Sequence, residues 1–295
     1  MSVGERVSAA RSAIAVYLEM IKIEHTFFAL PFAFLGMMLA AEGWPDWPTV
    51  GWVVAAMVGA RSAAMGFNRL VDRTIDAANP RTAMRALPAG TIRPGSVRVL
   101  IAASLLVLVV AAWRLDPLAL ALSPVAILVV LLYSYTKRFT AASHLVLGLG
   151  LAAAPLGAWI AVRGEIAAPA LVLALAVLAW VAGFDLLYAL QDVRFDRDHG
   201  LHSIPARFGV TATLALSAAL HALMLGALAA LPLLYAGPLG PGFAVGVAGC
   251  AVLLAYQHWV VRPGDLSRLD AAFFQANGAL AVWLFAATAV DILLP

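Results

Sequence analysis

Apolar residues fill most of the chain in long runs that short polar segments separate. Each run suits a helix that crosses a hydrocarbon core, which takes about 20 residues, and none shows the alternation of a membrane β-strand. Backbone groups in lipid must be hydrogen-bonded within the span, so helices fit this pattern. We expect an all-α polytopic membrane protein with nine spans, at roughly 23–41, 49–69, 97–113, 117–134, 143–161, 169–190, 211–232, 241–260 and 271–292.

The segment that precedes the first run, residues 1–22, carries basic residues but no small-residue cleavage site after its apolar part. It predicts an interfacial helix that leads into the first span, not a removed signal peptide. One bundle accounts for the whole length, so we expect a single domain over residues 1–295.

Composition supports the membrane class. The chain is 63% hydrophobic and only 12% charged, with a mean hydropathy of +0.94, which a soluble domain cannot carry on a solvated surface. A pI near 9.3 raises the question of a nucleic-acid partner. The net charge is only +3, however, and the basic residues lie in short loops between apolar runs. We therefore expect membrane lipid around the protein and no nucleic-acid partner.

The basic residues also predict the orientation. They gather before the first span and after the second, fourth, sixth and eighth, whereas the opposite loops hold Arg114 and Arg163. Positive loops face the cytoplasm, so the N-terminus is expected there. Trp44, Trp47 and Trp113 would then belong to an aromatic belt on the outer side.

The acidic residues gather in two stretches at the cytoplasmic ends of the second and sixth spans. The first Asp motif is NRLVDRTID (68–76), and the second Asp motif is DLLYALQDVRFDRD (185–198). On a continuous helix, Asn68, Asp72 and Asp76 would lie one above the other within about 80°. The second motif would form a similar stripe from Asp185, Asp192 and Asp196, with Tyr188 to its side.

Four carboxylates at one membrane face repel each other unless a cation lies between them. Oxygen-rich and sulfur-free sites of this kind suit Mg²⁺, so the predicted metal ligands are Asp72, Asp76, Asp192 and Asp196. The alternative is a pair of solvated loop ends held by salt bridges. The basic residues close by in sequence are Arg69, Arg73, Arg194 and Arg197.

A substrate phosphate fits the same pattern. Mg²⁺ held by a few carboxylates keeps coordination positions for phosphate oxygens, and an anion near a helix C-terminus needs positive partners. Arg81 and Arg85 follow the first motif, and Lys137 and Arg138 lie at the same membrane face. A diphosphate on a lipid tail would have its head at this interface and its tail in the bundle.

Arg61 lies well inside the second span, about 10 Å before Asn68 on nearly the same face. An arginine at that depth is costly unless it is paired. It is too deep for the diphosphate but lies at a suitable level for a second substrate beneath it. Its partner is either a carboxylate on that substrate or Asp185, and the sequence leaves both open.

The stretch NRLVDRTIDAANPRTAMRALPAG resembles the first signature of the UbiA superfamily of intramembrane prenyltransferases. DLLYALQDVRFDRDHGLHSIPARFG resembles the second, and the first span and the Lys137 loop are also similar, so the resemblance covers nearly the whole chain. Arg69 departs from the pattern, because many members have a further Asp there. This removes one possible metal ligand.

The resemblance implies a helical bundle around a central cavity and Mg²⁺-dependent transfer of a polyprenyl chain from its diphosphate to an acceptor. It implies catalytic roles for Asp72, Asp192, Lys137 and Asp185, with Asp185 or Asp192 as a proton acceptor. The expected substrate-binding residues are Asn68, Arg61, Arg81, Arg85, Tyr188 and Arg138. The implied location is the bacterial inner membrane, with the active site facing the cytoplasm.

The segments EHTFFALPFAF and GLHSIPARFG are most similar to quinone-pathway members that use a small aromatic acceptor such as 4-hydroxybenzoate. A menaquinone-pathway naphthoate, haem and a lipid are the alternative acceptors. A secondary transporter is the alternative from another class. It is disfavoured because the acids lie at one interface and the spans near them lack paired Gly or Pro breaks.

The sequence assigns no metal-binding or catalytic role to several histidines. His144, His221 and His258 lie on different spans with no second ligand at metal spacing, so we expect them to be packed structural residues. His202 and His25 remain undecided between a structural role and substrate contact.

Overall fold

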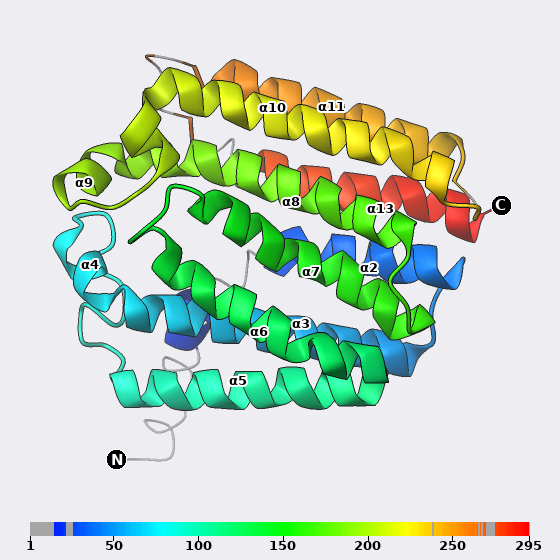
Figure 1. Cartoon of the computed structure of the whole chain (residues 1–295), viewed down its shortest axis with the longest axis horizontal. Helices are drawn as coiled ribbons and strands as arrows, with labels where there is room; N and C mark the ends of the chain where they lie inside the picture. Colours follow the sequence, from blue (N-terminus) through cyan, green and yellow to red (C-terminus); the bar gives the residue numbers. More distant parts are fainter. Residues whose placement is uncertain are drawn as a thin grey trace.

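Helices are the regular elements of the described part of the chain in this computed structural model. It describes residues 15–21, 26–237, 239–262, 264, 266, 268–269 and 275–294. The long helices lie side by side along one axis, and the short helices α4 and α9 lie together at one end (Figure 1). The all-α prediction is confirmed. The helices are α2 (Thr26–Ala41), α3 (Trp47–Val71), α4 (Arg73–Ala78), α5 (Pro94–Leu115), α6 (Pro117–Thr136), α7 (Ser143–Arg163), α8 (Ala168–Ala189), η2 (Leu190–Asp192), α9 (Val193–Asp198), α10 (Ile204–Leu234), α11 (Pro241–Val260) and α13 (Asn277–Leu293).

Seven of the described helices are long and apolar enough to cross a membrane. They are α3, α5, α6, α7, α8, α10 and α11, and each covers one of the apolar runs. The described parts of α2 and α13 are shorter apolar helices. The protein is therefore a polytopic membrane protein, and the count of nine spans stays a prediction.

The segment predicted as an interfacial helix, residues 1–22, is described only in part, because residues 1–14 and 22 lie outside the described ranges. His25 lies outside them as well. Residues 15–20 are helical. Met20 and Ile21 are buried in a small apolar cluster with Val97 and Ile101 of α5. This segment therefore packs against the bundle at its described end.

Helix α8 is the centre of the bundle. It packs against α7 and α10, and its side chains are buried on nearly every face, as expected for a helix that is apolar all round. Trp180 at its middle packs against Phe32 and Phe184 and donates a hydrogen bond to Asn277 of α13 over 2.9 Å. The second Asp motif thus begins on the most firmly held helix.

The first Asp motif begins on α3, which packs against α5. A Cβ atom placed on Gly59 would lie 2.7 Å from the carbonyl oxygen of Ser104. Small residues allow such close backbone approach in membrane bundles, where apolar surfaces have little preference for each other over lipid.

The continuous helix expected through each Asp motif is wrong, because both helices break inside the motif. Helix α3 ends at Val71, and α4 begins at Arg73. Asp72 caps both helices, with dihedral angles of φ −88° and ψ 7°. Helix α8 ends at Ala189 and continues through η2 into α9. The breaks put Asp76 and Asp196 in the first turn of a new helix, where free N–H groups favour negative charge.

Helix α10 also differs from its predicted span of 211–232, since it begins at Ile204. Gly209 has φ 83° and ψ 175°, which interrupts the helix near its start. A left-handed φ of this size is open to glycine at little cost. The residues before Gly209 form a separate first turn that the hydropathy pattern does not include in the span.

The contact between α7 and α8 gives a testable prediction. A Cβ atom on Gly148 would lie 2.5 Å from the carbonyl oxygen of Leu178, whereas one on Gly157 in the same helix would have no atom within 4 Å. We expect Gly148→Ala to destabilise the protein by about 1–3 kcal/mol through overpacking. Gly157→Ala is the matched control and should leave the thermal unfolding midpoint in detergent equal or higher. Equal midpoints for the two variants would contradict this packing.

Candidate functional site

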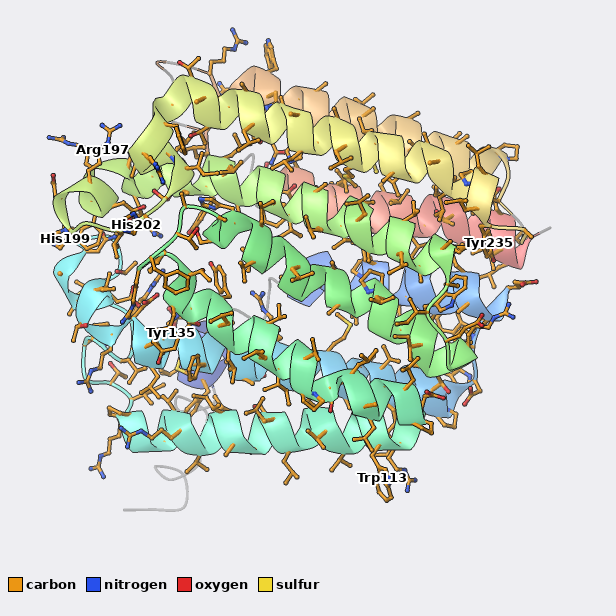
Figure 2. All side chains as sticks on the ribbon, in the orientation of Figure 1. Trp113, Tyr135, Arg197, His199, His202 and Tyr235 are labelled. Carbon is orange, nitrogen blue, oxygen red and sulfur yellow. The ribbon has the colours of Figure 1, made fainter. Side chains whose placement is uncertain are left out.

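The two Asp motifs meet at one end of the bundle. Arg197, His199 and His202 lie at this end, together with many other charged side chains, whereas Trp113 and Tyr235 lie toward the opposite end (Figure 2). Trp113 and Trp47 are 63% and 72% exposed, and their place in an outer aromatic belt stays a prediction. The polar end is the candidate site.

Asp72 lies at the centre of a cluster of positive groups. Its side chain is 3% exposed, and its Oδ2 atom lies 2.9 Å from Nζ of Lys137. Arg138 contacts Oδ1 over 3.1 Å, and Asn68 donates a hydrogen bond to Oδ2 over 3.1 Å. Two cations on one buried carboxylate offset the cost of removing it from water.

Asp76 is the second buried carboxylate of the first motif and is 5% exposed. Nη1 of Arg85 lies 2.8 Å from its Oδ1 atom, and Nη1 of Arg69 lies 3.9 Å from Oδ2. Arg69 stands where many members of the resembled family have a further Asp. In this chain its positive guanidinium lies near the carboxylate of Asp76 instead. Oδ2 itself is buried and has no hydrogen-bond donor among the described residues.

Asp192 is held by the loop that follows the first motif. Arg81 contacts both carboxylate oxygens, with Nε 3.0 Å from Oδ1 and Nη2 bound to Oδ2, and Asn79 donates to Oδ1 over 3.1 Å. Arg81 also donates to the hydroxyl of Tyr188 over 3.2 Å. A bidentate pair of this kind fixes both partners, so Arg81 ties the two motifs together.

Asp196 lies beside the capping loop of residues 199–203. Its carboxylate has Asp192, Lys137 and His144 within electrostatic range, and its backbone carbonyl accepts a hydrogen bond from the N–H of Leu201 over 2.8 Å. It therefore belongs to the same charged cluster as Asp72, although the structure does not pair it with an arginine of the first motif.

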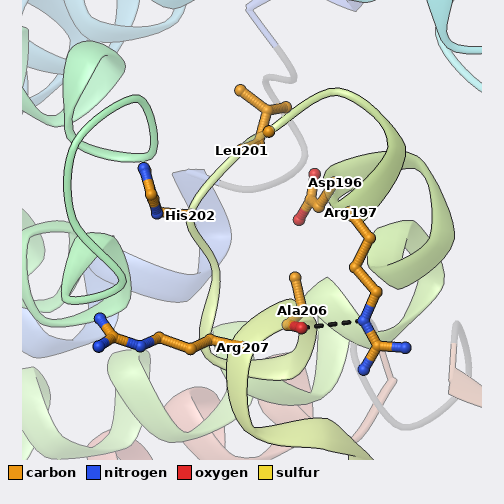
Figure 3. A pocket seen from close by; sticks show the side chains of 7 residues that line it. Asp196, Arg197, Leu201, His202, Ala206 and Arg207 are labelled. Atoms are coloured by element: carbon orange, nitrogen blue, oxygen red, sulfur yellow. Dashed lines mark hydrogen bonds between the residues drawn. The ribbon is translucent and has the colours of Figure 1, made fainter.

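A pocket of about 470 Å³ opens beside Asp196. Its lining includes Arg197, His202 and Arg207, and Arg197 donates a hydrogen bond to the carbonyl of Ala206 over 2.9 Å (Figure 3). The backbone N–H of His202 donates to the carbonyl of Lys137 over 2.7 Å. His202 thus has a structural role through its backbone, while its side chain lines the pocket.

Asp185 has a partner that the sequence analysis missed. Its Oδ2 atom lies 2.7 Å from Nδ1 of His144, and the two side chains are 17% and 5% exposed. His144 is buried, as expected of a packed residue. Nothing in the sequence indicated its pairing with Asp185, because the two residues are 41 positions apart and no local pattern joins them. His221 and His258 also contact each other, over 2.8 Å, between α10 and α11.

Tyr133 is the other missed residue. It lies on α6, within electrostatic range of Asp185, Asp72, Arg69 and Arg61. Arg61 itself is partly buried on α3. Tyr133 thus lies among charged residues of both motifs. The packing of α6 brings it there, and no motif in the sequence around it predicts this position.

The alternative of solvated loop ends is wrong for Asp72 and Asp76, because both are buried. The cations that balance them in this structure are side chains. The described residues bring together no group of three or more His, Cys, Asp or Glu side chains that could hold a metal. Mg²⁺ usually takes one or two carboxylates and completes its coordination with water and substrate phosphate. The oxygen-only ligand set and the unsatisfied Oδ2 of Asp76 fit that mode.

Comparison with known proteins gives a consistent family. Residues 29–285 match the UbiA prenyltransferase family. The chain is 33% identical over 256 residues to the 4-hydroxybenzoate octaprenyltransferase of Aromatoleum aromaticum, covering 86% of this chain and 85% of the relative. The protein of the same name from Methylobacillus flagellatus is 32% identical over 260 residues, covering 88% and 84%.

Solved structures share the fold. A UbiA homologue from Aeropyrum pernix K1 superposes with a TM-score of 0.82 at 34% identity, covering 92% of this chain and 99% of that one. A UbiA homologue from Archaeoglobus fulgidus, bound to DMAPP and Mg²⁺, gives a TM-score of 0.74 at 17% identity, covering 94% and 98%. At that identity the second similarity concerns the fold alone.

Proposed function

The chain belongs to the UbiA prenyltransferase family, and on that premise we propose that it transfers a polyprenyl chain from its diphosphate to 4-hydroxybenzoate with Mg²⁺ as cofactor. The observation that carries this proposal is the meeting of the two Asp motifs, whose carboxylates are held by Lys137, Arg81 and Arg85. We further propose that residues 1–295 act as one domain with nine spans in the bacterial inner membrane. The excess of basic residues at the motif end supports a site that faces the cytoplasm.

The choice of acceptor is supported by the relatives and by Arg61. Both relatives described above are named 4-hydroxybenzoate octaprenyltransferases. An arginine in the membrane-spanning part of α3 suits an acceptor that carries a carboxylate, because Arg binds carboxylates with strong charge-assisted hydrogen bonds. A naphthoate acid of the menaquinone pathway would satisfy the same side chain. Neither relative described above is named for a haem or lipid acceptor.

The carboxylates supply the metal ligands in this proposal. Asp72 and Asp76 on one side and Asp192 and Asp196 on the other would hold Mg²⁺, whose charge offsets that of the diphosphate and stabilises it as a leaving group. The unsatisfied Oδ2 of Asp76 and the sulfur-free ligand set support this assignment.

The basic side chains exchange partners when the substrate binds. Lys137 and Arg81 now occupy oxygens of Asp72 and Asp192. A diphosphate between the motifs competes for the same N–H groups, so each cation moves its hydrogen bonds from a carboxylate to a phosphate oxygen. This exchange releases the carboxylates and gives the diphosphate charge-assisted hydrogen bonds.

Two tyrosines are suited to the positive charge that would develop on the allylic carbon. Tyr133 lies among the charges of both motifs, and the guanidinium of Arg81 already lies 5.5 Å from the ring centroid of Tyr188. Ring faces attract cations, so both tyrosines are suited to stabilise the allylic cation before the acceptor ring attacks it.

The proposal is tested by incubating membranes that contain the protein with radiolabelled geranyl diphosphate, Mg²⁺ and a panel of acceptors. We expect a lipid-soluble prenylated product with 4-hydroxybenzoate and no accumulation of label inside vesicles. Accumulation without product would indicate a carrier, and product from a naphthoate acid alone would reassign the acceptor.

Asp72→Asn and Asp192→Asn should each lower kcat/KM at least about a hundredfold, because loss of one electrostatic contact to the transition state costs about 2.7–4 kcal/mol. Each variant should stay folded, since the substitution removes charge without changing volume. Asp198→Asn, at an exposed position in the second motif, is the matched control and should keep the parent rate. Near-parent turnover of either site variant at saturating Mg²⁺ would contradict the assignment.

Lys137→Ala should lower kcat at saturating prenyl diphosphate by about tenfold or more, which corresponds to about 1.4 kcal/mol. Free diphosphate should also inhibit this variant less than the parent, because the ammonium group binds the leaving group. Both values are measured by product formation with and without added diphosphate. Unchanged inhibition would limit Lys137 to its structural contact with Asp72.

Arg61→Ala should raise the KM for 4-hydroxybenzoate by about tenfold, since a hydrogen bond to a charged group contributes about 1.5–3 kcal/mol. The KM for the prenyl diphosphate should hardly change. Phenol, which lacks the carboxylate, is the matched substrate and should lose little further activity in the variant. If both KM values stay at parent level, an internal pair with Asp185 is favoured and Arg61 is not the acceptor's anchor.

A further inference from the structure

The proposed transfer requires a base that accepts one proton from the acceptor ring. Attack of the acceptor ring on the first prenyl carbon forms a C–C bond while the C–O bond to the diphosphate breaks, and the diphosphate leaves with the electron pair. The attacked ring carbon still carries its hydrogen. That hydrogen must depart as a proton to restore the aromatic ring, so a base is needed at the level of the ring.

The carboxylates nearest the diphosphate are poorly placed for this step. The oxygens of Asp72 accept contacts from Lys137, Arg138 and Asn68. Those of Asp192 accept hydrogen bonds from Arg81 and Asn79. Donors occupy these oxygens in the substrate-free structure. When the substrates bind and the donors move to the diphosphate, the same oxygens would serve as ligands of the proposed metal, so neither carboxylate is free to act as the base.

The His144–Asp185 pair has the geometry of an oriented base. The two side chains meet over 2.7 Å between Nδ1 and Oδ2. An ionised carboxylate only accepts hydrogen bonds, so Nδ1 carries the hydrogen and Nε2 carries the lone pair. Nε2 is buried and has no hydrogen-bond partner among the described residues. A buried polar atom without a partner requires an explanation, and a substrate supplies one.

The pair also lies at the appropriate place in the site. His144 is within electrostatic range of Asp196, and Asp185 is within range of Tyr133, as is Arg61. Asp185 lies on α8 about one turn before its end at Ala189, and Asp192 lies beyond that end in η2. Arg61 likewise precedes Asn68 on α3 by about 10 Å. The pair is therefore deeper than the diphosphate region and near the level of the acceptor ring.

We propose that His144 is the base that accepts the ring proton through Nε2, and that Asp185 positions the imidazole and stabilises the imidazolium that forms. This assignment rests on the proposed function and replaces Asp185 and Asp192 as the proton acceptor. The division of roles matches the general rule that a carboxylate fixes the tautomer of a catalytic histidine and the histidine moves the proton. The competing explanation is that His144 only joins α7 to α8.

His144→Asn separates the two explanations. The Asn amide can still donate to Asp185 but has no basic nitrogen, so it keeps the contact between the helices and removes the base. The full-length protein is assayed in detergent with geranyl diphosphate and with 4-hydroxybenzoate, either unlabelled or deuterated at the ring positions beside the hydroxyl. We expect kcat to fall by about 10²–10⁴-fold, and the deuterated acceptor to react more slowly than the unlabelled one in the variant.

A structural role would not create that isotope effect, because it alters binding or folding without making proton loss the slow step. Asp185→Asn should show a smaller fall in kcat with the same isotope effect. His258→Asn, which alters the histidine pair of α10 and α11, is the control and should keep the parent kcat. If His144→Asn fails to fold, His144→Gln carries the same expectations.

The outcomes separate the two levels of the proposal. If the parent prenylates 4-hydroxybenzoate and the His144 variant keeps its kcat, or loses it without an isotope effect, His144 is not the base. If the parent gives no prenylated 4-hydroxybenzoate, the proposed function is wrong, and the assignment of His144 is overturned with it.

Discussion

Pairing of buried carboxylates with cations is the constraint on which the candidate site depends. Asp72 and Asp76 are 2% and 5% exposed at the end of a strongly apolar bundle. Removing the partner of a buried charge costs about 3–5 kcal/mol, so each carboxylate is matched by basic groups from another segment. Lys137 reaches Asp72 from the end of α6, and Arg81 reaches Asp192 across the two motifs. The ion pairs therefore hold the segments of the site together and also balance the charge of its buried carboxylates.

The same pairing prepares the protein for an anionic substrate. A diphosphate needs N–H donors and a metal, and the metal needs free carboxylate oxygens. In this structure the basic side chains and the carboxylates are hydrogen-bonded to each other. Substrate binding therefore replaces one set of charge-assisted hydrogen bonds with another. It does not bring an unbalanced charge into an apolar site. The helix breaks at Asp72 and at Leu190–Asp192 support this arrangement, because they direct Asp76 and Asp196 into first turns that favour anions.

The sequence predicts those features that local patterns determine. Long apolar runs fix the helical membrane fold, and two similar Asp motifs on helices of the same direction predict that their acids meet at one end. The break at Asp72 was not predictable, because it depends on how α3 and α4 pack against the rest of the site. Contacts across the fold were also missed: His144 and Asp185 lie 41 positions apart, and Tyr133 joins the charged cluster only through the packing of α6. In the sequence, Arg69 counts as the loss of one possible metal ligand, but the structure places its guanidinium 3.9 Å from the carboxylate of Asp76.

The central claim is that the two Asp motifs bind one diphosphate together. A double-mutant cycle on binding tests it most directly, with Asp76→Asn, Asp196→Asn and the double variant titrated with geranyl thiolodiphosphate, a donor analogue that resists ionisation, at fixed Mg²⁺. If both motifs hold the same ligand, each single variant loses most of the affinity and the double variant loses clearly less than the sum of the two losses in free energy. Losses that add fully would show that the motifs act independently and would contradict a shared diphosphate site.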